Sequence, residues 1–406
     1  MVASYRKWLL QAHWNRIKDV LTVGFRDAAE HAGEGFYRGT SGQMQRATSE
    51  TLHADRAGMR CIEESASFAL SPAARRALPD GLEPPRTQRE LHDLWTGLSR
   101  EDRDALHRAD PFIGNRDGIP QVDRDHYNRQ TLAMLQDRAV SASDTEAVKR
   151  YGKIARALQP REGMPRRYLS LVDDKFRVAI AADNPDEATH VLTYLAPAGV
   201  NPITGGARLD KLRQAALAVD PHARTSVISW SGYEGAPSVS RAIESVHARN
   251  SAPVLRSYQE GLRVTHEGPP SHNTVLGYSY GSVTAGHAAA YEVPLAADNI
   301  IFAGSFGTGV ERASDLRLAG IDPADIDRHV FSTIAEHDWI RLMPKTHGTP
   351  PTSPSFGGTV FSTDSARGPW TSLGWNPHDH HSYWDTSNQV MKNMGLIVTG
   401  HGNLVT

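Results

Sequence analysis

The sequence has very little cysteine: its 406 residues include only Cys61. One thiol cannot form a disulfide within the chain, so cysteine usage says nothing about an oxidising or reducing compartment. The sequence also lacks any run of 18 apolar residues, which excludes the stretch that a membrane-spanning helix needs. Basic residues interrupt the first 30 positions, so we expect no cleavable signal peptide and a cytoplasmic protein, with export by another route left open.

An excess of charge of one sign is absent as well. The formal net charge is −2 at pH 7, so no field of the whole molecule favours nucleic acid as a partner. Hydrophobic residues make up 39% of the chain and charged residues 22%, which is typical of a soluble globular protein. A chain of this length can bury a large core and form about two folding units.

The residue pattern divides the chain into three regions. Residues 1–87 are predicted to be an N-terminal helical region and linker, because apolar residues recur at helical spacing before the proline-rich stretch 79–85. We consider these helices candidates for a protein contact. Residues 88–165 are predicted to be a helical lead-in that packs on the next domain, with helices from residue 88 and over 123–135. Residues 166–406 alternate strand and helix patterns.

The third region has the pattern of an α/β domain. Helical segments separate most of its apolar, β-branched runs, which favours a doubly wound, mainly parallel sheet. In such sheets ligands bind beyond the carboxyl ends of the strands. Strands are predicted at 176–181, 189–195, 225–230, 273–278, 299–303, 328–334 and 359–362.

The pentapeptide at residues 277–281, Gly-Tyr-Ser-Tyr-Gly, is the most informative motif. It follows the apolar run 274–276 and precedes a helix of small residues. A strand, a sharp turn that carries a serine and a thin helix are typical of the nucleophile elbow of an α/β-hydrolase. Ser279 is therefore the candidate nucleophile, and the fold prediction is an α/β-hydrolase fold behind an N-terminal helical region.

A serine nucleophile needs a base, and the base needs an orienting carboxylate. In this fold the partners follow in the order serine, acid, histidine. Asp338 leaves the end of the predicted strand 328–334 and is the candidate acid, with Glu336 in reserve. The candidate base lies in the loop 377–385, where His378, His380 and His381 compete.

The oxyanion hole of such an enzyme needs two backbone donors. One is expected from Tyr280, directly after the serine. The other is expected from the loop after the strand 189–195, at Ala198 or Gly199, because Pro197 has no N–H. The candidate walls of a substrate pocket are aromatic: Tyr233, Phe306 and Trp384.

From about residue 88 to the C-terminus the chain resembles the actinobacterial α/β-hydrolase family of unknown function. Its glycine turn, 304–309, matches except that Phe306 replaces the usual proline. The resemblance also covers the C-terminal motif, in which a histidine stands three residues before a tyrosine. With Tyr383 as that tyrosine, the resemblance implies His380 as the base and His381 as the runner-up. The other matching segments are 94–98, 113–120, 123–129, 227–233, 277–282, 347–357 and 397–400.

The predicted function is a serine hydrolase of the esterase or lipase kind. Ser279, Asp338 and His380 would form an acyl-enzyme on a small-molecule ester or lipid-like substrate, without a cofactor or metal. One alternative is an α/β-hydrolase fold that has lost activity and serves as an interaction module. Another is a metal-dependent hydrolase that uses the histidine cluster 378–381, although the spacing matches no common zinc pattern.

Overall fold

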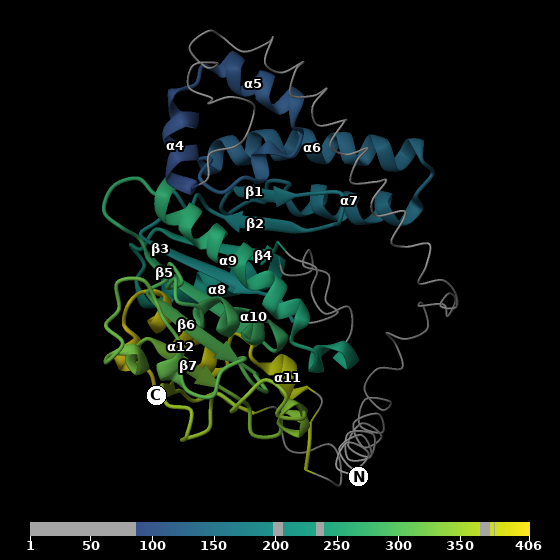
Figure 1. The fold of residues 1–406 in the computed structure, drawn as a ribbon. Coiled ribbons are helices and arrows are strands. Elements are labelled where there is room, and N and C mark those ends of the chain that lie inside the picture. Colours follow the sequence, from purple (N-terminus) through teal and green to yellow (C-terminus); the bar gives the residue numbers. More distant parts are fainter. Residues whose placement is uncertain (1–86, 198–205, 233–238, 366–373, 377) are drawn as a thin grey trace, which may run out of the picture. The chain divides into compact units, whose positions relative to one another are not determined.

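The computed structural model describes residues 87–197, 206–232, 239–365, 374–376 and 378–406. Contacts between Cα atoms divide the chain into two compact units, Met1–Ile113 and Gly114–Thr406 (Figure 1). The helices predicted before residue 87 lie outside the described residues. The predicted region boundaries at residues 87 and 165 therefore stay predictions.

The described part of the first unit consists of two short helices. Helix α4 (Gln88–Gly97) begins where predicted, with a capping box in which Thr87 and Glu90 exchange hydrogen bonds between side chain and backbone. Helix α5 (Arg100–Ala109) is capped by Ser99, whose side chain accepts from Asp102 N. These caps satisfy amides that have no partner within a helix.

The second unit is built on an eight-stranded sheet with the order β1-β2-β4-β3-β5-β6-β7-β8. The pairs β1–β2 and β2–β4 are antiparallel, and the other five pairs are parallel. The predicted fold class, a mainly parallel α/β sheet, is confirmed. The strands are β1 (Arg167–Val172), β2 (Val178–Ala182), β3 (His190–Leu195), β4 (Thr225–Ser231), β5 (His272–Tyr278), β6 (Asn299–Ala303), β7 (Val330–Thr333) and β8 (Thr359–Val360).

Seven of these strands overlap predicted strands, whereas β1 was missed. Its register shifts between Leu169 and Leu171, which marks a bulge. A bulge inserts one residue and interrupts the two-residue alternation by which a half-buried strand is recognised.

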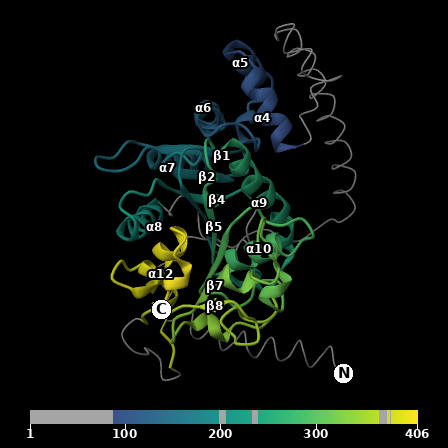
Figure 2. The ribbon, with the colours of Figure 1, turned by 90° about the vertical axis from the view of Figure 1, so that its left-hand side faces the viewer.

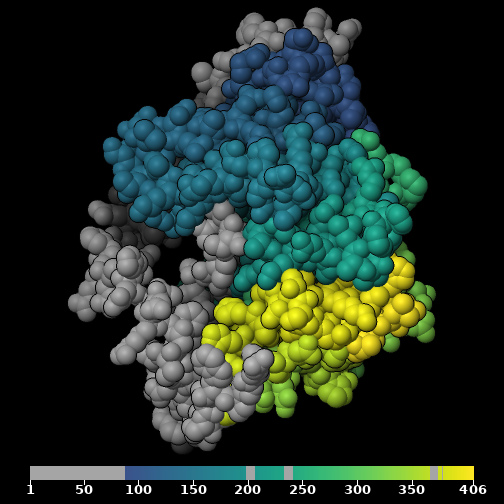
Figure 3. All heavy atoms as spheres, turned by 180° about the vertical axis from the view of Figure 1, so that it is seen from behind, coloured from purple at the N-terminus to yellow at the C-terminus, as the bar shows by residue number. Residues whose placement is uncertain are grey.

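Helices cover both faces of the sheet. Helices α8 (Gly206–Val219) and α12 (Gln389–Val398) pack on one face, and α9 (Val246–Thr265) and α10 (Tyr280–Ala289) on the other (Figure 2). Two hydrophobic cores lie against the sheet. Side chains of β3 alternate between them, as the pleat of a strand requires. Seen from behind, the C-terminal helix α12, in yellow, borders the teal surface to which α8 belongs (Figure 3).

Helix α6 (Gln121–Ser141) packs along β1, the edge strand, together with α7 (Thr145–Ala157). Polar side chains in this region bond to the backbone of β1 as a neighbouring strand would. Asn115 bonds to both N (2.9 Å) and O (2.8 Å) of Val172. Such bonds occupy backbone groups of the edge strand, which could otherwise pair with a strand of another chain. We call this group the edge cluster: Asn115, Arg124, Asp125, Asn128 and Arg129.

Candidate active site

Ser279 lies in the turn between β5 and α10, with φ 54° and ψ −121°. A residue with a Cβ rarely adopts this conformation, which costs about 1–3 kcal/mol and is found mainly at functional sites. The flanking glycines allow the turn to form. A Cβ on Gly277 would lie 2.5 Å from Ser282 Cα, and one on Gly281 would lie 2.4 Å from Leu195 O. The two glycines of the motif are therefore required by close backbone approach.

Asp338 follows β7 and is fully buried. Its side chain accepts from Ile340 N at 2.9 Å, so it caps the short 3₁₀ helix η6 (Trp339–Leu342). This cap fixes the carboxylate relative to its own backbone. The reserve candidate, Glu336, is exposed.

His380 joins the serine to the acid. Its Nε2 lies 3.1 Å from Ser279 Oγ, and its Nδ1 lies 2.9 Å from Asp338 Oδ2. His380 is 5% exposed. It belongs to helix α11 (Asp379–Ser382), a single turn where the sequence predicted a loop (Figure 1). The structure thus brings the three residues predicted as catalytic into one hydrogen-bonded chain.

Aromatic rings and a backbone bond hold the imidazole of His380 in place. Tyr278 stacks on it, with ring centroids 5.1 Å apart and an interplanar angle of 28°, and its hydroxyl donates to the His380 carbonyl. Trp339 packs at 5.1 Å from the same ring. Burial raises the pKa of Tyr278 well above its ordinary value of 10.0, so the hydroxyl stays a donor. The sequence pattern did not indicate this role for Tyr278, although the residue lies within the motif.

His381, the runner-up, points elsewhere. Its side chain is exposed, and its Nδ1 lies 3.5 Å from the Tyr278 hydroxyl. Within the described part of the chain it forms no hydrogen bond to Ser279 or Asp338. Adjacent side chains on a helix point about 100° apart, so only one of the two histidines faces the serine.

The remaining predicted residues lie in different places. Tyr280 begins α10, and its hydroxyl donates to Glu244 O at 2.7 Å. Phe306 is buried with its ring centroid 5.0 Å from that of His347, and Trp384 belongs to the core shared with α8 and α12. Their pocket roles stay predictions. Ala198, Gly199 and Tyr233 lie outside the described residues.

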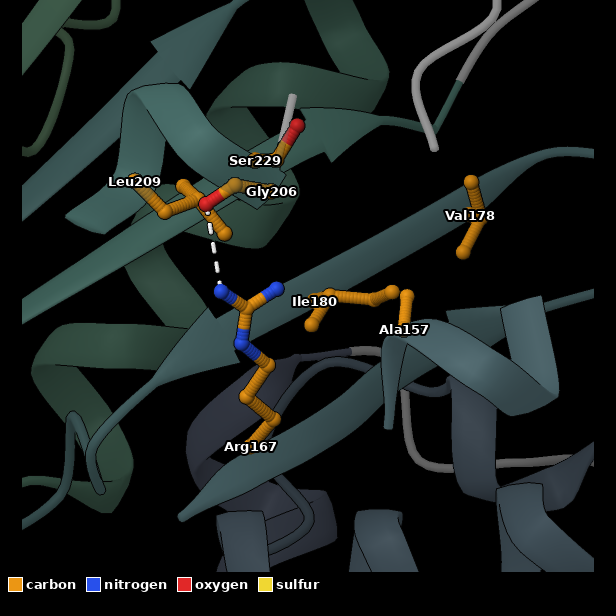
Figure 4. A pocket seen from close by; sticks show the side chains of 7 residues that line it. All are labelled: Ala157, Arg167, Val178, Ile180, Gly206, Leu209 and Ser229. Carbon is orange, nitrogen blue, oxygen red and sulfur yellow. Dashed lines mark hydrogen bonds between the residues drawn. The ribbon is translucent and has the colours of Figure 1, made fainter. Parts of the chain in front are cut away.

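A small cavity in the second unit lies at β1, β2 and β4. Figure 4 shows that Arg167 points across it and donates to Gly206 O at 3.1 Å. Arg167 also pairs with Asp210 at 2.9 Å. None of the three candidate catalytic residues lines this cavity, so it does not identify the acyl pocket. The lining residues are Ala157, Arg167, Val178, Ile180, Gly206, Leu209 and Ser229.

Among the residues that the structure describes, no group of three or more His, Cys, Asp or Glu side chains has the arrangement of a metal site. No helix in the described ranges is both long and apolar enough to cross a membrane.

The strand order and the strained serine turn between β5 and α10 define an α/β-hydrolase fold. Residues 174–347 match the model of a family described as "Alpha/beta hydrolase". The resemblance inferred from the sequence is confirmed, and the match supports a hydrolase.

Two curated sequences from strains of Mycobacterium tuberculosis, each described as an uncharacterized protein, are 28% identical to this chain over 384 residues. The alignment covers 80% of this chain and 58% of each relative, so the chain spans less than two thirds of their length. Solved structures to which this chain is similar include an esterase from Mycobacterium marinum, at 13% identity and a TM-score of 0.37, covering 67% of this chain and 90% of that one. A hormone-sensitive lipase from a metagenome library is 15% identical, with a TM-score of 0.35, covering 68% and 98%.

Proposed function

We propose that this chain is a serine hydrolase that cleaves a carboxylic ester through an acyl-enzyme. The observation that carries the proposal is the continuous chain of hydrogen bonds from Ser279 Oγ through His380 to Asp338. All three side chains are buried, with Ser279 at 7% exposed. The strained backbone of Ser279 costs free energy, and so does the burial of its hydroxyl beside an imidazole. Neither feature adds to the packing of the core, so a structural role does not explain them.

In the proposed reaction His380 Nε2 accepts the hydroxyl proton as Ser279 Oγ attacks the acyl carbon. The imidazolium that forms is stabilised by Asp338, to which Nδ1–H donates. The proton then passes to the leaving alcohol. Water, activated by the same imidazole, attacks the acyl-enzyme and releases the acid.

We assign the stabilisation of the oxyanion to backbone amides. Tyr280 follows Ser279 and begins α10, so its N–H lies at the positive end of that helix. We propose this N–H as one donor and the backbone of Ala198 or Gly199 as the other. Removing one donor from an oxyanion hole typically costs about 10²–10³-fold in turnover.

Labelling with a fluorophosphonate probe tests the nucleophile. We expect the wild type to label with one probe per chain and Ser279→Ala not to label. The matched control is Ser251→Ala, which removes another buried serine hydroxyl, on α9, that bonds to His247 O. This control is expected to label like the wild type. An unlabelled wild type, or equal labelling of Ser279→Ala, would refute the proposal.

A chelator separates the serine mechanism from the metal alternative. We expect hydrolysis of a p-nitrophenyl ester to be unchanged by a chelator and abolished by Ser279→Ala. Loss of the rate on chelation, with recovery on adding a divalent metal, would instead favour a metal site at His378–His381.

A further inference from the structure

Asp338 accepts more hydrogen bonds than its partnership with His380 requires. Oδ2 lies 2.9 Å from His380 Nδ1 and also accepts from the Tyr383 hydroxyl at 2.7 Å. Oδ1 accepts from Ile340 N. Both oxygens of the carboxylate are therefore bound by donors other than His380.

The Tyr383 hydroxyl is itself held by a second bond. It accepts from Ala335 N at 2.9 Å, the amide three residues before Asp338. The side chain is fully buried. Its ring packs edge-on against Tyr278, with centroids 5.9 Å apart. Gly304, at φ 54°, leaves room for it, because a Cβ there would lie 3.1 Å from the Tyr383 ring.

The spacing in the sequence explains why one segment supplies both donors. His380 and Tyr383 are three residues apart across the single turn of α11, so their side chains lie on one side of that turn. Further bonds tie this segment to the acid turn: Asn376 N donates to His337 O, and His337 N donates to Asp379, both at 2.9 Å. The base and the acid are thus carried by two segments that are bonded to each other.

We propose that Tyr383 is a positioning residue of the triad: its hydroxyl fixes the plane of the Asp338 carboxylate and so the direction of the His380 imidazole. The inference rests on the proposed serine mechanism. Burial, followed by the charge of Asp338, raises the pKa of Tyr383 well above 10.0, so the hydroxyl remains a donor wherever the enzyme works. Without it Oδ2 loses a donor, and the carboxylate can rotate about its side-chain torsion.

The test is Tyr383→Phe, which removes only the hydroxyl. We expect kcat for p-nitrophenyl ester hydrolysis to fall by about 10- to 100-fold with KM within about 2-fold, since a misplacement of about 1 Å costs about 10²-fold. Rates are divided by the concentration of sites that a fluorophosphonate titrates, so a misfolded fraction does not contribute.

The matched control is Tyr151→Phe, which deletes another buried tyrosine hydroxyl, bonded to Asp173 O at 3.2 Å. It is expected to change the melting temperature but neither kcat nor KM. If Ser279→Ala abolishes turnover while Tyr383→Phe behaves like Tyr151→Phe, the role of Tyr383 is refuted and the serine mechanism stands. If Ser279→Ala retains the wild-type rate, the serine mechanism itself fails.

Discussion

Two of the buried polar groups in the second unit can be compared, the edge cluster against β1 and the Ser279–His380–Asp338 group. Their most buried members are equally hidden: Asn128 and Asp338 are both 0% exposed, and Arg124 is 3% exposed. Burying such groups is costly unless each finds hydrogen-bond partners. They differ in which partners they find. Every member of the edge cluster bonds to the backbone of β1, whereas Ser279, His380 and Asp338 bond mostly to one another's side chains.

We propose that this difference separates a structural polar cluster from a reactive one. A side chain that bonds to a strand's backbone completes the pairing of that strand, and nothing remains to be transferred. In the Ser279–His380–Asp338 group the serine hydroxyl lies against an imidazole nitrogen, which can accept its proton. Only this group is built on strained backbone, at Ser279. Burial and charge alone would not have distinguished the two.

The largest expected effect lies in the reactive group. His380→Ala should lower turnover of an ester by about 10³-fold or more, because it removes the proposed general base. His381→Ala is the matched control from the adjacent position and should leave turnover within about 2-fold. Steady-state kinetics on both variants checks this, with melting temperatures to compare their folding.

Equal losses in the two variants would show that the imidazole nearest Ser279 is not the base. The hydrogen bond from Ser279 to His380 would then be structural, and the two polar groups would no longer differ in reactivity.

The sequence allowed much of this arrangement to be predicted. The strand-turn-helix pattern around Ser279, an acid at a later strand end and a histidine near the C-terminus are local signals in a known order. The residues of the edge cluster lie in segments 113–120 and 123–129, which match the resembled family, but the sequence indicated no role for them. Asp125 meets Leu169 N across 44 positions, and no local pattern encodes such a pairing. The bulge hid β1 for a related reason, since it breaks the alternation that marks a strand.

The second prediction concerns the structural group. Asn128 donates to Gly114 O at 3.2 Å and to Leu169 O at 3.1 Å, and Asn128→Ala leaves both carbonyls without this donor. We expect the free energy of unfolding to fall by about 2–4 kcal/mol. The kcat per titrated site should not change. Urea unfolding and ester kinetics measure the two quantities.

Gln130→Ala serves as the control, because Gln130 lies on the exposed side of the same helix. It should change the free energy of unfolding by less than about 0.5 kcal/mol. A loss of kcat in Asn128→Ala comparable to that of His380→Ala would mean that the edge cluster is not purely structural.

The smallest effect we predict depends on pH and concerns Asp186, a buried carboxylate that joins the start of α6 to the end of α9. It accepts from Gln121 N at 2.5 Å and from Thr265 Oγ1 at 2.6 Å. Burial raises its pKa from 3.8 to about 6, against the opposing effects of these two bonds and of Arg124, while Glu267 adds to the rise. The folded state therefore holds this proton more tightly than the unfolded state. The resulting contribution to stability is complete below pH 3.8 and is lost as the pH rises to about 6.

Asp186→Asn removes this titration while keeping the shape of the side chain. Its free energy of unfolding, relative to the wild type, should therefore rise between pH 4 and 7, by at most about 3 kcal/mol. Asp183→Asn, the same change in the same loop, controls for the loss of one negative charge. Urea unfolding at several pH values measures this difference in the free energy of unfolding. A difference that stays constant or shrinks with pH would show that Asp186 is ionised in the folded protein at pH 4, and that its bonds to Gln121 and Thr265 outweigh its burial.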